Sequence, residues 1–152
     1  MTVGYEPKNE IQKAFLDGIE EVYSTLLCNH VLLYFLDEEN TKVDSLYGET
    51  TEKKYLEPYE LIAKVTYDHP KGENPEETVI RKAQFRIPTK QFLTLGIPFL
   101  QEADWERMRQ AKLVYEGTEY LIDTVKPSTL VADIWQFFEF SATEAKKNSI
   151  SR

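Results

Sequence analysis

The apolar residues near the start of the chain recur at the spacing of one helix face. They form a single stripe that consists of Ile11, Phe15, Ile19, Val22 and Leu26. Pro7 suits the first helical turn, where its missing N–H costs nothing. We therefore expect an amphipathic helix over about residues 7–28. Its stripe must pack either on the rest of the chain or on a neighbouring subunit. Gly18 costs the helix roughly 1 kcal/mol relative to alanine, which indicates that a partner approaches closely there.

From residue 30 the pattern changes to one that is typical of β-strands. Residues 31–36 are a continuous apolar run, which favours a buried strand. Residues 59–68 and 79–87 alternate apolar and polar positions on either side of the polar loop 69–78. These two segments are expected to pair as an antiparallel hairpin.

A second hairpin is predicted over residues 112–127. Two β-rich runs flank Glu116-Gly117, a turn dipeptide in which Gly117 can adopt a positive φ at no steric cost. Pro127 lacks the N–H of a ladder residue and is expected to close the second strand. Residues 134–140 then form an aromatic strand, so either both of its faces are covered or one face is an interface.

Two short helices complete the prediction. Thr89 can cap a helix that ends at Gly96, and Trp105 and Met108 fall at helical spacing within residues 101–111. The fold class expected is α+β, mainly antiparallel β, with a small β-barrel or curved sheet. One domain would cover residues 1–142, with its β core over about 30–142, followed by a polar tail over 143–152.

Charge narrows the classes of function. Residues 1–60 hold 13 acidic and 5 basic residues and carry the whole net charge of −8. Such acidity argues against a protein that binds nucleic acid through contacts to its phosphates. The alternative interpretation is that acidic surfaces only keep the chain soluble.

No apolar run approaches the roughly 20 residues of a membrane helix, and no signal peptide is expected. A single cysteine excludes an internal disulfide and fits a reducing compartment.

No pattern in the sequence predicts catalysis, a metal site or a cofactor. Cys28, His30 and His69 are too few for a structural zinc site, and the six glycines are too dispersed for a phosphate-binding loop. The chain is therefore not expected to be an enzyme. A cluster of four basic residues could instead help a β-barrel to bind single strands, and it comprises Arg81, Lys82, Arg86 and Lys90. The competing interpretation of that cluster is a solvated strand face or a protein interface.

A series of short motifs over residues 44–140 resembles the head–tail connector proteins of tailed bacteriophages, the neck or head-closure family. They are Asp44-Ser45-Leu46-Tyr47-Gly48-Glu49, Glu57-Pro58, Phe85-Arg86-Ile87-Pro88, Leu95-Gly96-Ile97, Tyr115-Glu116-Gly117 with Tyr120 and Ile122, and Val125-Lys126-Pro127, closed by the aromatic strand. Where the family has a Gly-Asp pair before the hairpin, this chain has Ala103-Asp104.

The resemblance implies a structural virion protein that is assembled in the host cytoplasm. Its subunits would form a homo-oligomeric ring that contacts a portal or adaptor protein and a tail protein. Double-stranded DNA would pass through the ring without specific binding. The alternative is a monomeric β-barrel binding module, which would act on single-stranded nucleic acid or inhibit a host protein.

The long polar connection over residues 41–58 carries the candidate interaction residues. Asp44, Tyr47, Gly48 and Glu49 would form a turn that presents an aromatic ring and a carboxylate to a partner. A second hypothesis concerns four acidic residues that would face the DNA channel, namely Glu38, Glu39, Asp44 and Glu52. The competing account is that these carboxylates solubilise the subunit or meet basic patches on the next ring.

Replacing Tyr47 and Glu49 together by alanine should leave the fold intact and impair assembly, because both lie in a segment too polar for the core. Thermal melting and incorporation into virions are the two measurements. Normal incorporation would contradict the hypothesis, and so would unfolding of the double variant, since Tyr47 would then be a core residue.

Overall fold

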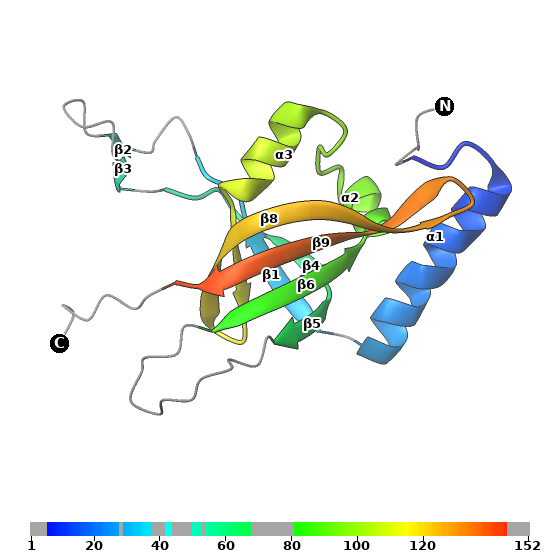
Figure 1. Cartoon of the computed structure of the whole chain (residues 1–152), viewed down its shortest axis with the longest axis horizontal. Helices are drawn as coiled ribbons and strands as arrows, with labels where there is room; N and C mark the ends of the chain where they lie inside the picture. The colour runs from blue at the N-terminus through cyan, green and yellow to red at the C-terminus, as the bar shows by residue number, and fades with distance from the viewer. Residues whose placement is uncertain are drawn as a thin grey trace.

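The computed structural model describes residues 6–27, 29–37, 42–43, 50–52, 54–67 and 81–145. Helix α1 (Glu10–Val22) begins the described chain and continues into a turn of π-helix, η1 (Tyr23–Leu27). A seven-stranded antiparallel sheet forms the body (Figure 1), with the spatial order β4 (Tyr59–Ile62), β1 (His30–Tyr34), β7 (Lys112–Tyr115), β8 (Thr118–Val131), β9 (Ile134–Glu144), β6 (Lys82–Pro88) and β5 (Lys64–Tyr67). The expected α+β fold with a curved sheet is confirmed.

The sheet is curved and open rather than a closed barrel. Its two outermost strands, β4 and β5, are consecutive in the chain and are separated by Ala63 alone. The strand expected over residues 59–68 is therefore split, because β4 pairs with β1 whereas β5 pairs with β6. The predicted hairpin is confirmed for β5 and β6, with Val65 opposite Phe85. One bent segment thus supplies both edges of the sheet, which limits the length of each edge.

A side chain covers the outer edge of β4. Gln91, on helix α2 (Thr89–Leu95), accepts a hydrogen bond from the Ile62 N–H at 2.7 Å and donates one to the Ile62 carbonyl at 2.8 Å. Its amide thereby occupies the place of a neighbouring strand. Because Gln91 is buried, this pairing also satisfies its own polar atoms.

The main hydrophobic cluster lies between the inner face of the sheet and helices α2 and α3 (Glu102–Arg109). Alternate residues of β6 and β9 point into it, as the pattern predicted for β6; they include Ala83, Phe85, Ile87, Phe138 and Phe140. Both short helices are confirmed. Gly96 ends α2 with a φ of 69°, although Thr89 is its first residue and not its cap. Gln101 and Asp104 form a capping box at the start of α3.

The predicted hairpin at Gly117 is confirmed. Tyr115 pairs with Thr118, and the two turn residues have φ values of 51° at Glu116 and 78° at Gly117, the left-handed pair that a tight two-residue hairpin requires. The prediction that Pro127 closes the strand is wrong, because β8 continues to Val131. Proline is tolerated there because β7 pairs with β8 no further than Leu121, so this part of β8 has no ladder on that side.

One further expectation needs correction. Strand β9 runs to Glu144, two residues into the predicted polar tail, because β6 pairs with it as far as Thr143 and β8 as far as Glu144. The long polar connection over residues 41–58 contains a small antiparallel pair, β2 (Lys42–Val43) and β3 (Thr50–Glu52). Figure 1 shows that this pair stands away from the main sheet.

Replacing Gly117 by valine should destabilise the protein by about 1–3 kcal/mol, because a β-branched residue resists a positive φ. Urea unfolding would measure the loss. Gly18→Ala is a suitable control: a Cβ at Gly18 meets nothing within 4 Å, so alanine should stabilise α1 by up to about 1 kcal/mol. A Gly117→Val variant as stable as the parent would show that the turn tolerates other residues.

Candidate interaction surfaces

Helix α1 packs on the sheet through residues that do not belong to the predicted stripe. Leu16 and Tyr23 are buried, as are Ile134 and Phe137 of β9, and none of these four residues belongs to the main cluster. The ring centroids of Tyr23 and Phe137 are 5.2 Å apart. The Gln12 amide donates a hydrogen bond to the Ala132 carbonyl at 2.8 Å, which ties the helix to the tip of the β8–β9 hairpin.

The predicted apolar stripe is therefore on the surface. Its exposed fractions are 66% for Ile11, 44% for Phe15, 49% for Val22 and 74% for Leu26, and only Ile19 is half-buried. Because a helix turns by about 100° per residue, the stripe is centred roughly a quarter turn from the face that contains Leu16 and Tyr23. Of the two destinations that the sequence left open, packing on the chain's own core is wrong for these four residues. We call them the α1 stripe.

Contacts on the other flank of α1 fix its orientation. Asp17 forms an ion pair with Lys90 of α2 at 3.0 Å, and Glu20 lines a hollow together with residues of α2 and β4. The α1 stripe consequently lies on the flank that faces away from α2. Ile11, Phe15, Gly18 and Val22 follow a 4-3-4 spacing, which is that of a helix-packing seam. Glu10 and Glu21 form the rim of this seam, and both are exposed without an ion pair to another described residue.

The outer face of the sheet carries a row of four charged residues that cross four strands side by side. The strand registers place Lys126 opposite Glu139, Glu139 opposite Arg86, and Arg86 opposite Lys64. We call these four residues the charged row. A neighbouring row holds hydroxyl and amide groups, from Thr124, Ser141, Gln84 and Thr66. Polar alternation on the outer face thus extends from β8 to β5.

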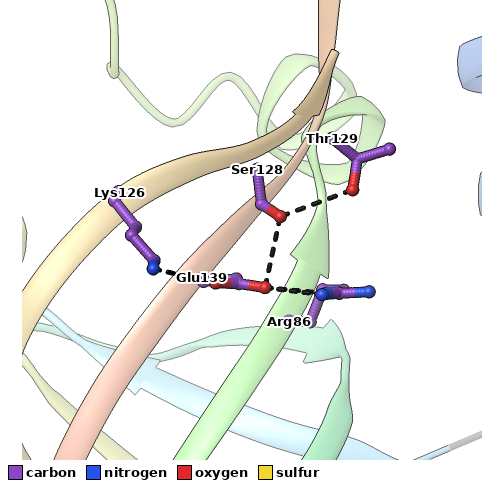
Figure 2. Close-up of polar contacts among 5 residues, drawn as sticks. All are labelled: Arg86, Lys126, Ser128, Thr129 and Glu139. Carbon is purple, nitrogen blue, oxygen red and sulfur yellow. Dashed lines mark hydrogen bonds and ion pairs between the residues drawn. The ribbon is translucent and has the colours of Figure 1, made fainter. Parts of the chain in front are cut away.

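Glu139 contacts two cations of the charged row, Arg86 and Lys126, as Figure 2 shows. Its Oε1 accepts hydrogen bonds from Nε and Nη2 of Arg86 at 3.1 and 2.6 Å and from the Ser128 hydroxyl at 3.2 Å. Its Oε2 lies 3.6 Å from the Lys126 ammonium. The hydrogen bond from Arg86 is the largest influence on this carboxyl and lowers its pKa below the ordinary value of 4.5. Both carboxylate oxygens are therefore engaged within the chain.

Arg86 connects the charged row to helix α1. Its guanidinium carbon lies 5.3 Å from the ring centroid of Phe137, the same ring that Tyr23 contacts. Burial raises the pKa of the Tyr23 hydroxyl, and the neighbouring Arg86 partly opposes that shift. Between the charged row and the hydroxyl row is a polar hollow of about 70 Å³, lined by Lys64, Thr66, Gln84, Arg86 and Glu139.

The site residues predicted from the sequence fall mostly outside the described part of the chain. Asp44, Tyr47, Gly48, Glu49, Glu38 and Glu39 all lie outside the described residues. Glu52 ends β3, but its side chain is not described. The interaction and channel hypotheses for these residues therefore remain predictions.

The predicted basic cluster does not form one surface. Arg86 is paired with Glu139, Lys90 is paired with Asp17, and Arg81 lies over the Tyr67 ring at 5.4 Å. Lys90 separates from the others because it follows Pro88 into α2, so it belongs to a different element. Lys82 stays on the outer sheet face.

His30 contacts Glu60 at 2.9 Å on the surface, whereas Cys28 and His69 lie outside the described residues. Within the described ranges, no group of three or more His, Cys, Asp or Glu side chains could hold a metal ion. No helix in the same ranges is both long and apolar enough to cross a membrane.

Comparison with known proteins does not assign the chain to a family: no protein-family model matches it, and no curated protein matches its sequence.

The charged row could not be found from the sequence, although one signal was present. Alternation along β6 and β9 places Arg86 and Glu139 on outward positions. Their pairing depends on the register between strands that are far apart in the chain, and no local pattern encodes that register.

Glu139→Gln should reduce stability at neutral pH, and the difference from the parent should shrink in acid. A carboxyl whose pKa is lowered by folding stabilises the native state above its unfolded pKa, and this contribution is lost as the pH falls through the folded pKa. Unfolding midpoints of parent and variant between pH 7 and pH 2 would measure it. In an Arg86→Met background the same substitution should have a smaller effect. A pH-independent difference would show that the pair contributes only by packing.

Proposed function

We propose that this chain is a structural subunit of a tailed-phage neck, where copies of it form a ring that joins the DNA-filled head to the tail and lets DNA pass. The observation that carries the proposal is the α1 stripe, whose four large apolar side chains are between 44% and 74% exposed along one helix face. A contiguous apolar surface of this kind on a small acidic protein is typical of a protein–protein contact.

The charges beside the stripe favour a ring over a two-fold dimer. If two α1 helices packed face to face, Glu10 and Glu21 of one copy would meet the same residues of the other copy. Like charges at a shared rim disfavour that arrangement. A stripe that instead contacts a different surface of the next copy makes a heterologous interface, and such interfaces close into rings when the rotation allows.

The resemblance to connector proteins supplies the biological setting. Several of the residues that carry it are scaffold residues here, since Phe85, Ile87, Ile97, Tyr120 and Val125 are buried. They account for a curved sheet rather than for a binding site. In the proposed setting the ring contacts a portal or adaptor protein on one side and a tail protein on the other. The acidic excess, including Glu38 and Glu39, would lower the affinity of the channel for DNA phosphates.

The second candidate function is a monomeric module that binds single-stranded nucleic acid or a host protein. The observation that favours it is the set of cations and hydroxyls on the outer sheet face. This function predicts that the purified protein is a monomer at every concentration. If the ligand is a nucleic acid, it also predicts oligonucleotide binding that weakens steeply as the salt concentration rises. Light scattering and binding at two salt concentrations therefore separate it from the ring.

Phe15→Gln combined with Val22→Gln should convert the assembled protein to monomers and change its thermal stability little, because both side chains are already exposed. Light scattering across a concentration series is the measurement. Leu95→Gln with Leu100→Gln is the matched control, since these leucines are 43% and 52% exposed on other parts of the chain.

The control variant should assemble like the parent. Two results would count against the proposal: a parent chain that stays monomeric throughout the series, or a stripe variant that assembles as well as the parent. The virion assignment has its own test, which is the copy number of the chain in purified phage particles relative to the portal protein. A chain that is absent from those particles would leave the monomeric module as the better function.

A further inference from the structure

One cation of the charged row, Lys64, has no compensating carboxylate among the residues that the structure describes. Lys64 stands directly opposite Arg86 in the register of β5 and β6, and like charges in directly opposed positions destabilise a sheet. Glu139 cannot neutralise Lys64 as well as Arg86, because Arg86, Ser128 and Lys126 already engage its two carboxylate oxygens. Lys64 is exposed and forms no ion pair with another described residue. An anion placed beside Lys64 and Arg86 would relieve this repulsion.

The groups around that position are arranged to receive such an anion. The polar hollow of about 70 Å³ lies between Lys64, Thr66, Gln84, Arg86 and Glu139. Thr66 and Gln84 form no side-chain hydrogen bond with another described residue, so a hydroxyl and an amide remain available as donors. Among the described lining residues, two cations against one saturated carboxylate leave a net positive charge. The volume of the hollow suits one carboxylate group, which charge-assisted hydrogen bonds would hold.

We propose that this hollow is the receptor for acidic residues of α1 on the next copy of the chain, with one rim carboxylate, Glu10 or Glu21, in the hollow and the other at Lys82. The proposal rests on the ring assembly proposed above and names the surfaces that meet in it. Both glutamates are exposed, belong to the acidic first part of the chain and form no ion pair with another described residue.

The spacings of the two surfaces agree. Glu10 and Glu21 are eleven residues apart, which is about 16 Å along a helix. Arg86 and Lys82 are four residues apart on the outward side of β6, which is about 13 Å along a strand. Long flexible lysine and glutamate side chains cover the difference of about 3 Å. The neighbouring helix would thus run along β6.

The matched spacing selects a copy of this chain over nucleic acid as the occupant. The net charge of −8 opposes a second copy as well as a phosphate backbone, whereas Glu10 and Glu21 are spaced to meet Arg86 and Lys82. This acidic helix rim would meet a local surface of opposite charge, and the two surfaces differ, as a ring requires. The contact is heterologous because donor and receptor lie on separate parts of the subunit.

Charge exchange between two variants tests the contact. The receptor variant carries Lys64→Glu and Lys82→Glu, and the donor variant carries Glu10→Lys and Glu21→Lys. Each alone should lose assembly, because acid then faces acid or base faces base. An equimolar mixture should recover it, because each donor then meets a receptor of opposite charge. Light scattering gives the mass, and thermal melting checks that both variants fold. Glu57→Lys with Glu102→Lys is the control for added positive charge at exposed sites.

Every outcome decides the question. Assembly of either variant alone at the parental level overturns the contact, and so does a mixture that fails to recover although both variants are folded. In both cases the proposed ring assembly through the α1 stripe is still supported if the parent assembles and the α1 stripe variant does not. A parent that never assembles overturns the ring and this contact together. Oligonucleotide binding by the parent that the receptor variant loses, with assembly unchanged, assigns the hollow to phosphate and also overturns it.

Discussion

The packing around Phe138 is the constraint on which the rest of the structure depends. Its ring lies in the middle of β9 with no exposed surface, and its centroid is within 5.7 Å of those of Phe92, Phe99 and Trp105. Trp105 also donates a hydrogen bond to the Phe99 carbonyl at 2.8 Å. One side chain therefore holds α2, α3 and the segment between them on the inner face. Aromatic edge contacts of this kind add about 0.5–1.5 kcal/mol each to the burial of the rings.

Because Phe138 fixes the inner face of β9, it also fixes the positions of the side chains on the outer face of this strand. Because neighbouring strand residues point to opposite faces, Phe137 and Glu139 face outward on either side of Phe138. The Phe137 ring packs against Tyr23 and so sets the position of α1. Glu139 accepts hydrogen bonds from Arg86 and Ser128 and forms an ion pair with Lys126. The inner face of β9 is thus covered by its own chain, and Tyr23 covers the outer face at Phe137, whereas Glu139 and Ser141 remain partly exposed. Both candidate surfaces, the α1 stripe and the charged row, are positioned by this one strand.

The sequence predicted the features that local chemistry decides. Gly117 and Gly96 have the positive φ values that their turns require, and the alternation predicted over residues 79–87 is confirmed from Lys82 to Ile87. It could not predict which face of α1 would be buried. Gln12 is polar, yet it is buried because it reaches the Ala132 carbonyl, a residue 120 positions away in sequence. The break at Ala63 and the register of the charged row likewise depend on strand pairing between distant segments.

In the proposed ring, the α1 stripe would need the charges beside it as well. Completing the burial of four side chains that are about half exposed would contribute roughly 1 kcal/mol each, or about 4 kcal/mol in all. Association costs at least about 4 kcal/mol in lost translational and rotational freedom. The stripe alone therefore only offsets that cost, and the surplus must come from further contacts. In that ring, Glu10 and Glu21 would supply it only against a surface of opposite charge. The same residues that would oppose a two-fold dimer would therefore favour an ordered, one-directional contact between copies.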